Sequence, residues 1–564
     1  MKSAQLLIRG ARVVDGTGMP GFSADVEVRD GRISQMGNLR GATADKVIDA
    51  DGLVLTPGFV DVHTHYDPQL HFDSSASPSS WHGVTTVLTG NCGFALSPSK
   101  PADLEWLVLM LAKVEGMSAE ALTEGVDFSG GSVADFLGNL DGRIGVNMAY
   151  YVGHSAIRRW VMGSEASERA ATASEIEAMQ GLLDQGMRDG AVGFSTSQLD
   201  VHADHEGKPI PSNLATSEEI VALASVLANY NQGIMEHLCQ SFAVGYDTRD
   251  RALLRDMAVA SGGKPLHVNP LLRFTNEPDA WRLCLDVLEG YSREGLRVYP
   301  MASANPKGLH IALCDTGMLD EMPTFRSSLS GPLAQRMAVL RKPDVRDALR
   351  REFDEPRQLA FGWSQLRVVG VRDAGHQDWV DQTVAEIARE RGHDELDTFL
   401  DLSLEEDLET VFVIDRPVIQ EDRDVIAFLL EHPLTTPGSS DGGAHVNTFC
   451  GADYTTRILT EYAGSETFSF EDAVRKLTSV PAMTAGIWDR GVVRPGAAAD
   501  LVLLDRERLA VGPCRLVRDL PAGAARLVFD QEGYVATIVN GQVVIDEGKP
   551  TGATGGSVLR FNRA

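Results

Sequence analysis

The chain has 564 residues, with 79 acidic against 51 basic side chains and a formal net charge of −28. Hydrophobic residues make up 43% of it, which indicates a globular protein with ample core and excludes a disordered or fibrous one. The acidic excess argues against nucleic acid as the main partner, because phosphate contacts need a basic surface. Six cysteines are too few for a disulfide scaffold and are typical of a reducing compartment.

No targeting or membrane segment stands out. The opening sequence MKSAQLLIRGARVVDGTG lacks the continuous apolar stretch of a signal peptide, and no 18-residue apolar run occurs in the chain. We therefore expect a cytoplasmic protein without a membrane span. The length allows three or four domains, or equally one large barrel with additions.

The first 58 residues have the pattern of β-strands. LLIRGARVV alternates apolar and polar side chains, and Asp30-Gly31 is a two-residue hairpin signal within VEVRDGRISQM. The last part of the chain has the same character, with ADLVLLD at 499–505 and Asn540-Gly541 between two alternating runs. We predict one small β-sandwich domain built from residues 1–58 and 485–564, whose strands pair across the two ends.

The middle of the chain, 59–484, alternates short apolar runs with helical stretches. Strands that alternate with helices indicate a parallel sheet, and eight such units favour a TIM-like (β/α)8 barrel in an α/β protein. A doubly wound sheet with extra strands fits the same count. The eight runs span residues 58–65, 84–93, 144–154, 190–197, 233–238, 264–272, 296–301 and 435–443.

The interval between the seventh and eighth runs is far too long for a single helix. It contains several helix patterns, including QRMAVLRKPDVRDALRREF and DWVDQTVAEIARERG. A structureless loop of this length inside a compact domain is implausible. We predict an inserted subdomain over about 302–434, positioned as a lid over the barrel mouth.

Two histidines end the first run of the barrel. His63 and His65 are two residues apart in a strand-like segment, so their side chains point to the same side, as metal ligation requires. Taken alone, two histidines that merely alternate are the more common explanation. Their place at a strand end matters, because the active site of a barrel lies at the C-terminal ends of its strands.

Four further residues occupy similar positions. Cys92 follows the second run between glycines, and His237 and His267 are separated by one helix, which places them at the ends of adjacent strands. Asp441 ends the eighth run in a Gly/Ser turn. Each has a bland explanation on its own, such as a buried cysteine, a core histidine or a turn-forming aspartate.

Together, the six residues have a simpler common explanation. A zinc ion bound by histidine and cysteine ligands, with an open coordination position, would account for all of them on one face. Zinc lowers the pKa of bound water and polarises a substrate carbonyl. Asp441 would then take the proton of the water and return it to the leaving nitrogen, as general base and then general acid.

Several motifs of the chain resemble those of a known family. The β domain from both termini, PGFVDVHTH and the late aspartate resemble the amidohydrolase superfamily. TGNCGFALSP, GHSAIRRWVMG, GAVGFSTS and GSSDGGAH resemble its D-aminoacylase (N-acyl-D-amino-acid deacylase) branch, in which a cysteine replaces the carboxylated lysine that bridges two metals in hydantoinases. The resemblance covers nearly the whole chain.

The resemblance implies specific roles. Cys92, His237 and His267 would hold one tightly bound zinc ion, while His63, His65 and Asp441 would form a second, weaker site or act without metal. The implied activity is zinc-dependent hydrolysis of the amide bond in a small N-acyl compound, such as an N-acyl-D-amino acid. Family habit also implies homo-oligomers.

The sequence departs from the family in the substrate pocket. The usual Lys two residues after the second isolated histidine is Asn269 here, and the His-Pro-Arg tripeptide after the aspartate turn is missing. Tyr299 is kept, and Arg457 and His445 are candidate substrate-binding residues. These differences favour a remodelled substrate pocket. Such a pocket is less well suited to bind a substrate with a free carboxylate.

Two other functions fit the same residues. One is a zinc hydrolase of a cyclic imide, a lactone or an ester. The other is a non-catalytic scaffold or binding protein with an amidohydrolase fold. The six retained site residues argue against this second function. We found neither a phosphate-binding Gly loop nor a GxSxG elbow, so ATP chemistry and serine-hydrolase chemistry have no sequence support.

Overall fold

The centre of the protein is a sheet of eight parallel strands in the order β16-β12-β11-β10-β9-β8-β7-β6. The computed structural model describes residues 4–274, 276–304, 309–314, 319–356, 360–414, 420–438, 440–446 and 451–561. The eight strands are β6 (Phe59–Asp61), β7 (Val84–Thr89), β8 (Asn147–Gly153), β9 (Gly193–Ser197), β10 (Ile234–Leu238), β11 (Leu266–Leu271), β12 (Val298–Ala302) and β16 (Thr436–Pro437).

Residues just beyond the two outer strands close this sheet into a barrel. Thr64 and Gly442 form a parallel bridge, and the His65 N–H donates to the Gly442 carbonyl at 2.7 Å. Each of the eight strands arises from one of the eight predicted apolar runs, so the predicted (β/α)8 barrel is confirmed. The closing contact involves the same two segments that carry His65 and Asp441.

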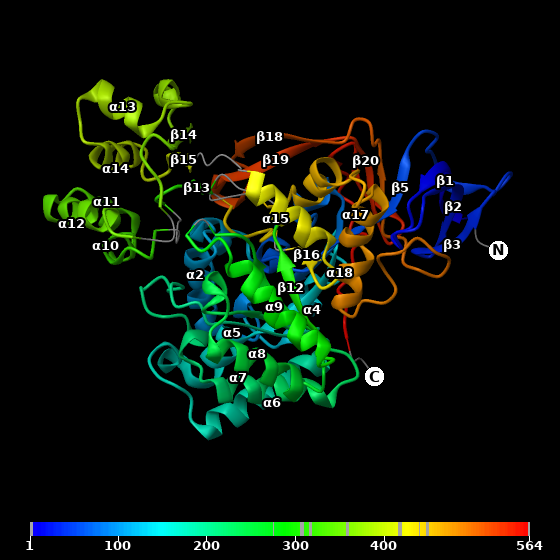
Figure 1. Cartoon of the computed structure of the whole chain (residues 1–564), viewed down its shortest axis with the longest axis horizontal. Helices are drawn as coiled ribbons and strands as arrows, with labels where there is room; N and C mark the ends of the chain where they lie inside the picture. Colours follow the sequence, from blue (N-terminus) through cyan, green and yellow to red (C-terminus); the bar gives the residue numbers. More distant parts are fainter. Residues whose placement is uncertain are drawn as a thin grey trace.

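Helices surround the barrel, as Figure 1 shows. Helix α6 illustrates how their ends are set, since the Thr172 hydroxyl and the Glu175 carboxylate form a capping box, and Gly190 ends the helix with a φ of 113°. The helices between the barrel strands and around them are α1 (Tyr66–Gln69), α2 (Leu104–Val114), α3 (Ala119–Gly125), α4 (Val133–Leu140), α5 (His154–Met162), α6 (Ala173–Asp189), α7 (Ser217–Val226), α8 (Thr248–Ala260), α9 (Ala280–Arg293), α15 (Gln420–Glu431), α16 (Tyr454–Arg457), α17 (Phe470–Leu477) and α18 (Ser479–Thr484).

The two ends of the chain meet in one nine-stranded sheet. Strand β5 pairs antiparallel with β17, with Leu55 opposite Leu503, so strands from the two ends of the chain pair as expected. The bounds 1–58 and 485–564 of a β-sandwich domain stay a prediction. In Figure 1 it lies beside the barrel, with blue strands next to red ones. Its strands are β1 (Ala4–Val13), β2 (Phe22–Arg29), β3 (Arg32–Gly37), β4 (Ala44–Asp49), β5 (Val54–Pro57), β17 (Leu501–Leu504), β20 (Tyr534–Val539), β21 (Gln542–Asp546) and β22 (Lys549–Pro550).

Both predicted hairpin signals form tight turns in this sheet. Asp30 and Asn540 have φ values of 47° and 46°, and each is followed by a glycine with positive φ. A type I′ turn requires two consecutive residues with positive φ. A separate hairpin, β18 (Ala510–Val517) with β19 (Arg526–Glu532), lies between β17 and β20 in the chain.

The inserted segment has its own core. Apolar side chains that include Phe325, Leu349, Phe399 and Phe412 pack together there. Its elements are β13 (Leu309–Ile311), α10 (Pro323–Ser328), α11 (Leu333–Leu340), α12 (Pro343–Phe353), β14 (Leu366–Gly370), α13 (Val384–Arg391), α14 (Glu395–Glu405) and β15 (Val411–Ile414). Helix α15, which follows it, instead packs Leu429 and Leu430 into the core of the barrel.

Within the described parts of the chain, no helix is both long and apolar enough to cross a membrane. The cytoplasmic location, the exclusion of nucleic acid and the formation of homo-oligomers stay predictions.

Candidate metal centre

Three buried side chains converge at the C-terminal end of the barrel. His63 and His65 follow β6, and Cys92 lies in the short turn Asn91–Gly93 after β7. The Cys92 Sγ is 3.4 Å from the His63 Nε2, and one ligand atom from each residue lies within 4.8 Å of the others. This arrangement could hold a metal ion.

The turn that carries Cys92 is tightly constrained. Cys92 has a φ of 55°, in the left-handed region that side chains other than glycine seldom adopt. A Cβ at Gly90 would come within 2.6 Å of the Tyr151 carbonyl oxygen, so the turn packs directly against β8. The Asn91 side chain donates to the Thr64 carbonyl at 3.0 Å and thereby ties the turn to the residue between the two histidines.

Asp441 joins this group from the other side of the barrel closure. Its Oδ1 lies 3.2 Å from the His63 Nε2 and 4.0 Å from the His65 Nε2. Its side chain is 21% exposed, whereas those of the two histidines are almost fully buried. The carboxylate is thus the part of the group that solvent can reach.

The pairing register decides which residues of β10 and β11 face the barrel interior. Glu236 is paired with His267, and His267 is paired with Tyr299, so these three side chains share one face. Glu236 contacts Cys92, which shows that this face is the interior. Because side chains alternate along a strand, His237 projects to the opposite face, where it is paired with Thr196.

The structure therefore separates the two isolated histidines of the sequence. Both are buried, and no ring nitrogen of His237 or His267 has a hydrogen-bond partner among the described residues. Asn269, one step further along the interior face of β11, places its Nδ2 3.5 Å from the His63 Nε2 and 3.9 Å from the Cys92 Sγ. His267 thus belongs to the face that looks at Cys92, and His237 does not.

Two buried carboxylates near the site were not identified from the sequence. The Glu236 Oε2 accepts the backbone N–H of Cys92 at 2.7 Å. The Glu115 Oε2 lies 3.7 Å from the His65 Nε2 and 3.4 Å from the Nε2 of His445, the predicted substrate-binding histidine. The available signal was a lone acidic residue in an apolar run, at the end of LVLMLAKVEG for Glu115 and inside GIMEHL for Glu236.

The other two candidate substrate residues differ in their surroundings. Tyr299 is half-buried, and its ring centroid is 6.3 Å from that of His267. Arg457 donates to Asp453 and to Glu461, each at 2.6 Å, and its guanidinium lies over the ring of Phe529. The charge of Arg457 is thus already paired within the protein.

A family model described as "Amidohydrolase family" matches residues 46–545. The chain belongs to the amidohydrolase family. It is therefore a hydrolase that acts on carbon–nitrogen bonds, as predicted, and the predicted D-aminoacylase branch agrees with its relatives. An N-acyl-D-aspartate deacylase of Alcaligenes xylosoxydans xylosoxydans is 29% identical over 555 residues, covering 98% of this chain and 93% of the relative.

Two more proteins support the same branch. A D-aminoacylase of Alcaligenes xylosoxydans xylosoxydans is 37% identical over 238 residues, which cover 41% of this chain and 44% of the relative. The crystal structure of an N-acyl-D-glutamate deacylase from Bordetella bronchiseptica, complexed with zinc and a phosphonate inhibitor, has a TM-score of 0.68 at 23% identity. It covers 99% of this chain and 100% of that chain, and it shows the fold.

The electrostatics of the amidohydrolase site favour a bound cation. Burial, with the charge of His267 as a smaller cause, lowers the pKa of His63 to about 3, and burial lowers that of His267 to about 4. Burial and neighbouring carboxylates raise the pKa values of the Cys92 thiol and of Glu115. A divalent metal needs neutral imidazoles and stabilises a thiolate, so it would relieve the cost of burying these groups together.

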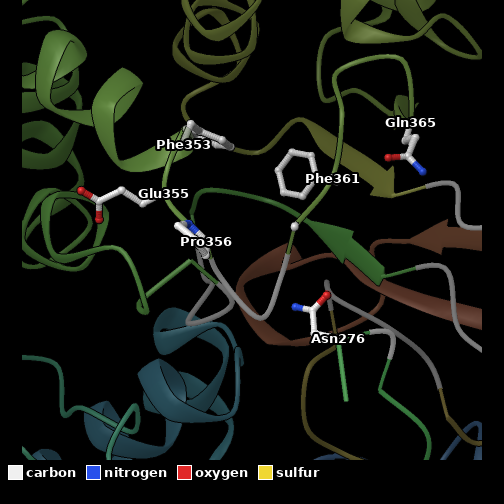
Figure 2. A pocket seen from close by; sticks show the side chains of 7 residues that line it. Asn276, Phe353, Glu355, Pro356, Phe361 and Gln365 are labelled. Carbon is white, nitrogen blue, oxygen red and sulfur yellow. The ribbon is translucent and has the colours of Figure 1, made fainter. Parts of the chain in front are cut away.

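A cleft of about 630 Å³ lies between the inserted segment and the barrel of this amidohydrolase (Figure 2). Figure 2 shows Asn276, from the loop after β11, below Pro356 and Phe361 of the insert. None of the predicted metal or substrate residues lines this cleft. Its lining residues are Asn276, Phe353, Glu355, Pro356, Ala360, Phe361 and Gln365.

Proposed function

We propose that this amidohydrolase cleaves the amide bond of a small N-acyl compound, with an N-acyl-D-amino acid as the first candidate substrate. The observation that carries the proposal is the convergence of His63, His65 and Cys92 within 4.8 Å, with the Asp441 carboxylate 3.2 Å from His63. The relative named as a deacylase of N-acyl-D-aspartate supports the substrate class.

Zinc is the metal that fits this donor set best. Two ligands of one zinc ion lie about 3.5 Å apart, given Zn–S near 2.3 Å and Zn–N near 2.0 Å at a tetrahedral angle. The observed separation of 3.4 Å between the Cys92 Sγ and the His63 Nε2 matches that spacing. We assign His63, His65 and Cys92 to the metal, with His267 facing them, and we propose one tight site and one weaker site.

The remaining residues provide proton transfer and substrate binding. Bound zinc supplies an activated water and polarises the substrate carbonyl. Asp441 accepts the proton of the attacking water and delivers it to the leaving nitrogen, a role that its partial exposure permits. We assign substrate binding to His445, which lies beside Glu115, and to Tyr299, which lies beside His267.

We also propose that the inserted segment, predicted over about 302–434, acts as a lid over the barrel mouth. The Lys113 Nζ in α2 forms a salt bridge of 3.0 Å with the Oδ2 of Asp320 in the insert, and both side chains are largely buried. Glu115, two residues further along, contacts His65 and His445. The insert is thus tied to a segment that reaches the metal site directly.

A second candidate substrate class is an amide without a free carboxylate. Two observations favour it: Arg457 is already paired with Asp453 and Glu461, and Asn269 occupies the position at which the resembled branch carries a lysine. A cyclic imide, a lactone or an ester would use the same proton transfer.

The decisive experiment is a hydrolysis screen on zinc-loaded protein. N-acetyl-D-amino acids, N-acetyl-L-amino acids and carboxylate-free amides are compared at equal concentration, with Asp441→Asn as the inactive control. Turnover of the D-amino acid derivatives above the other classes supports the first substrate class. Turnover of carboxylate-free amides alone moves the assignment to the second, and turnover of neither class contradicts the proposal.

Metal content of three variants tests the ligand assignment. His63→Ala and Cys92→Ala should lose metal and activity together, and full activity of a metal-free Cys92→Ala protein would contradict a metal mechanism. His237→Ala distinguishes two ligand sets. Loss of metal would place His237 in the site, as the family resemblance implies, whereas full metal content would leave the ligands on the interior face of the barrel.

A further inference from the structure

We propose that Glu236 is a positioning residue of the metal centre, whose carboxylate fixes Cys92 and His63 relative to each other. The inference rests on the proposed function, because it concerns the same metal. Glu236 is fully buried on β10. The pairing of β10 with β9 and β11 makes its side chain point into the barrel interior.

One oxygen of this carboxylate holds the turn of Cys92. The Glu236 Oε2 accepts the Cys92 N–H at 2.7 Å, at the short end of the range for a backbone N–H···O hydrogen bond. Cys92 is in the left-handed region, so its backbone needs an outside partner to stay there. Because the turn directs the thiol toward His63, this hydrogen bond helps to set the position of the Sγ.

The other oxygen faces His63. The Glu236 Oε1 is 3.9 Å from the His63 Nδ1 and also 3.9 Å from the Cys92 Sγ. The Nε2 on the far side of the His63 ring lies near Cys92 and Asp441. Within the described residues, the Nδ1 has no hydrogen-bond partner. An imidazole that binds metal through one nitrogen donates the proton on its other nitrogen to a carboxylate, carbonyl or water, and here Glu236 is the carboxylate in place.

The two contacts make Glu236 a bridge between β6 and β7. His63 follows β6 and Cys92 follows β7, and Glu236 reaches both from β10, across the barrel interior. A fully buried carboxylate is costly unless it is hydrogen-bonded and paired. An ordering role at the metal site accounts for its presence, since the salt bridge that the structure gives it is to His63.

Glu236→Gln is the sharpest variant, because it replaces one oxygen by an amide nitrogen at nearly constant volume. The glutamine oxygen can still accept the Cys92 N–H. Its NH2 group then faces the His63 Nδ1–H. Because both groups are hydrogen-bond donors, no hydrogen bond can form between them. Glu27→Gln is the matched control, since Glu27 is also a buried carboxylate but lies in the terminal sheet, paired with Arg29.

The experiment measures zinc affinity of the whole protein by chelator competition and the thiolate-to-metal absorption of the Co²⁺ form. Glu236→Gln should bind zinc about 10–100-fold more weakly, the range for loss of a carboxylate behind a metal-binding histidine. It should keep the thermal stability of the control and, at saturating Co²⁺, the thiolate band from Cys92. Glu236→Asp, which keeps the charge, should recover part of the affinity.

The outcomes separate this inference from the proposed function. Wild-type zinc affinity in Glu236→Gln would overturn the positioning role and leave the proposed function intact. Absence of metal binding by the unaltered protein would overturn both. An affinity loss matched by an equal loss in Glu27→Gln would mean a general effect of removing a buried carboxylate, and it would also overturn the inference.

Discussion

The Asp441 Oδ1 lies 3.2 Å from the His63 Nε2, and Asp441 itself has a φ of 52° just beyond β16. The left-handed backbone turns the carboxylate back over the end of the barrel, toward the nitrogen that also faces Cys92. The proposed proton-transfer group and the proposed metal ligands thus meet across the point where the barrel closes.

Asp441→Asn should abolish most activity without removing the metal. The amide has the size of the carboxylate but cannot accept the proton of water, and loss of a general base typically lowers rates by about 10²–10⁴-fold. The measurement is kcat together with zinc content by elemental analysis. Loss of zinc in parallel with activity would mean that Asp441 serves mainly as a metal ligand.

Lys476 should make stability depend on pH in the alkaline range. Its buried Nζ donates to the carbonyls of His432 and Thr435 in the segment before β16, and burial lowers its pKa from 10.5 to about 7. Between these two values the unfolded chain binds more protons than the folded protein. Raising the pH therefore favours folding, by at most about 1.4 kcal/mol per pH unit.

The comparison with Lys476→Met isolates this effect. Thermal unfolding of both proteins from pH 7 to pH 10 should give a rise in stability for the wild type that the variant lacks. Unfolding temperatures that run in parallel across this range would show that the lysine is already charged in the folded state.

Glu219→Gln should destabilise the protein without affecting the metal. Arg158 and Glu219 form a fully buried salt bridge of 2.5 Å, and the His154 Nε2 lies 2.9 Å from the Glu219 Oε1. Removing one charge leaves the other buried and unpaired, at a cost of about 3–5 kcal/mol. Chemical denaturation measures the loss.

A surface pair is the control for this prediction. Glu294→Gln breaks an Arg255–Glu294 ion pair whose two side chains are both about half exposed, and it should change stability little. Equal losses in the two variants would contradict the importance of burial. Altered zinc content in Glu219→Gln would show that the network reaches the metal site.

Asp320→Asn should loosen the insert from the barrel. It weakens the salt bridge to Lys113, two residues before Glu115, so the insert would close less firmly over the site. We expect KM to rise several-fold while zinc content stays unchanged. An unchanged KM would remove the support that this contact gives to a lid.

The barrel and most of its site could be predicted because their signals are local. Each barrel strand appears in the sequence as an apolar run, and His63, His65 and Cys92 stand at the ends of such runs. The face of His237 could not be predicted in this way. Strand β10 is buried on both faces along all 5 of its residues, so alternation in polarity does not mark the interior side.

The two buried carboxylates of the site could not be predicted for a different reason. Glu236 is 144 positions from Cys92 in the chain, and Glu115 reaches His65 from the end of a helix. The register of the barrel strands brings Glu236 to Cys92, and the placement of α2 brings Glu115 to His65. The ion pairs of Arg457 did have a local signal, because Asp453 and Glu461 lie four residues before and four residues after it, the spacing at which side chains of a helix meet.

The pairing of β5 with β17 has a consequence for biosynthesis. Strand β17 is translated about 440 residues after β5, which takes about 20–90 s at about 5–20 residues per second. During that time the growing chain exposes a strand edge that attracts other strands. The barrel strands are therefore all made while the neighbouring sheet is incomplete, and that sheet closes only when β17 and the strands after it have been made.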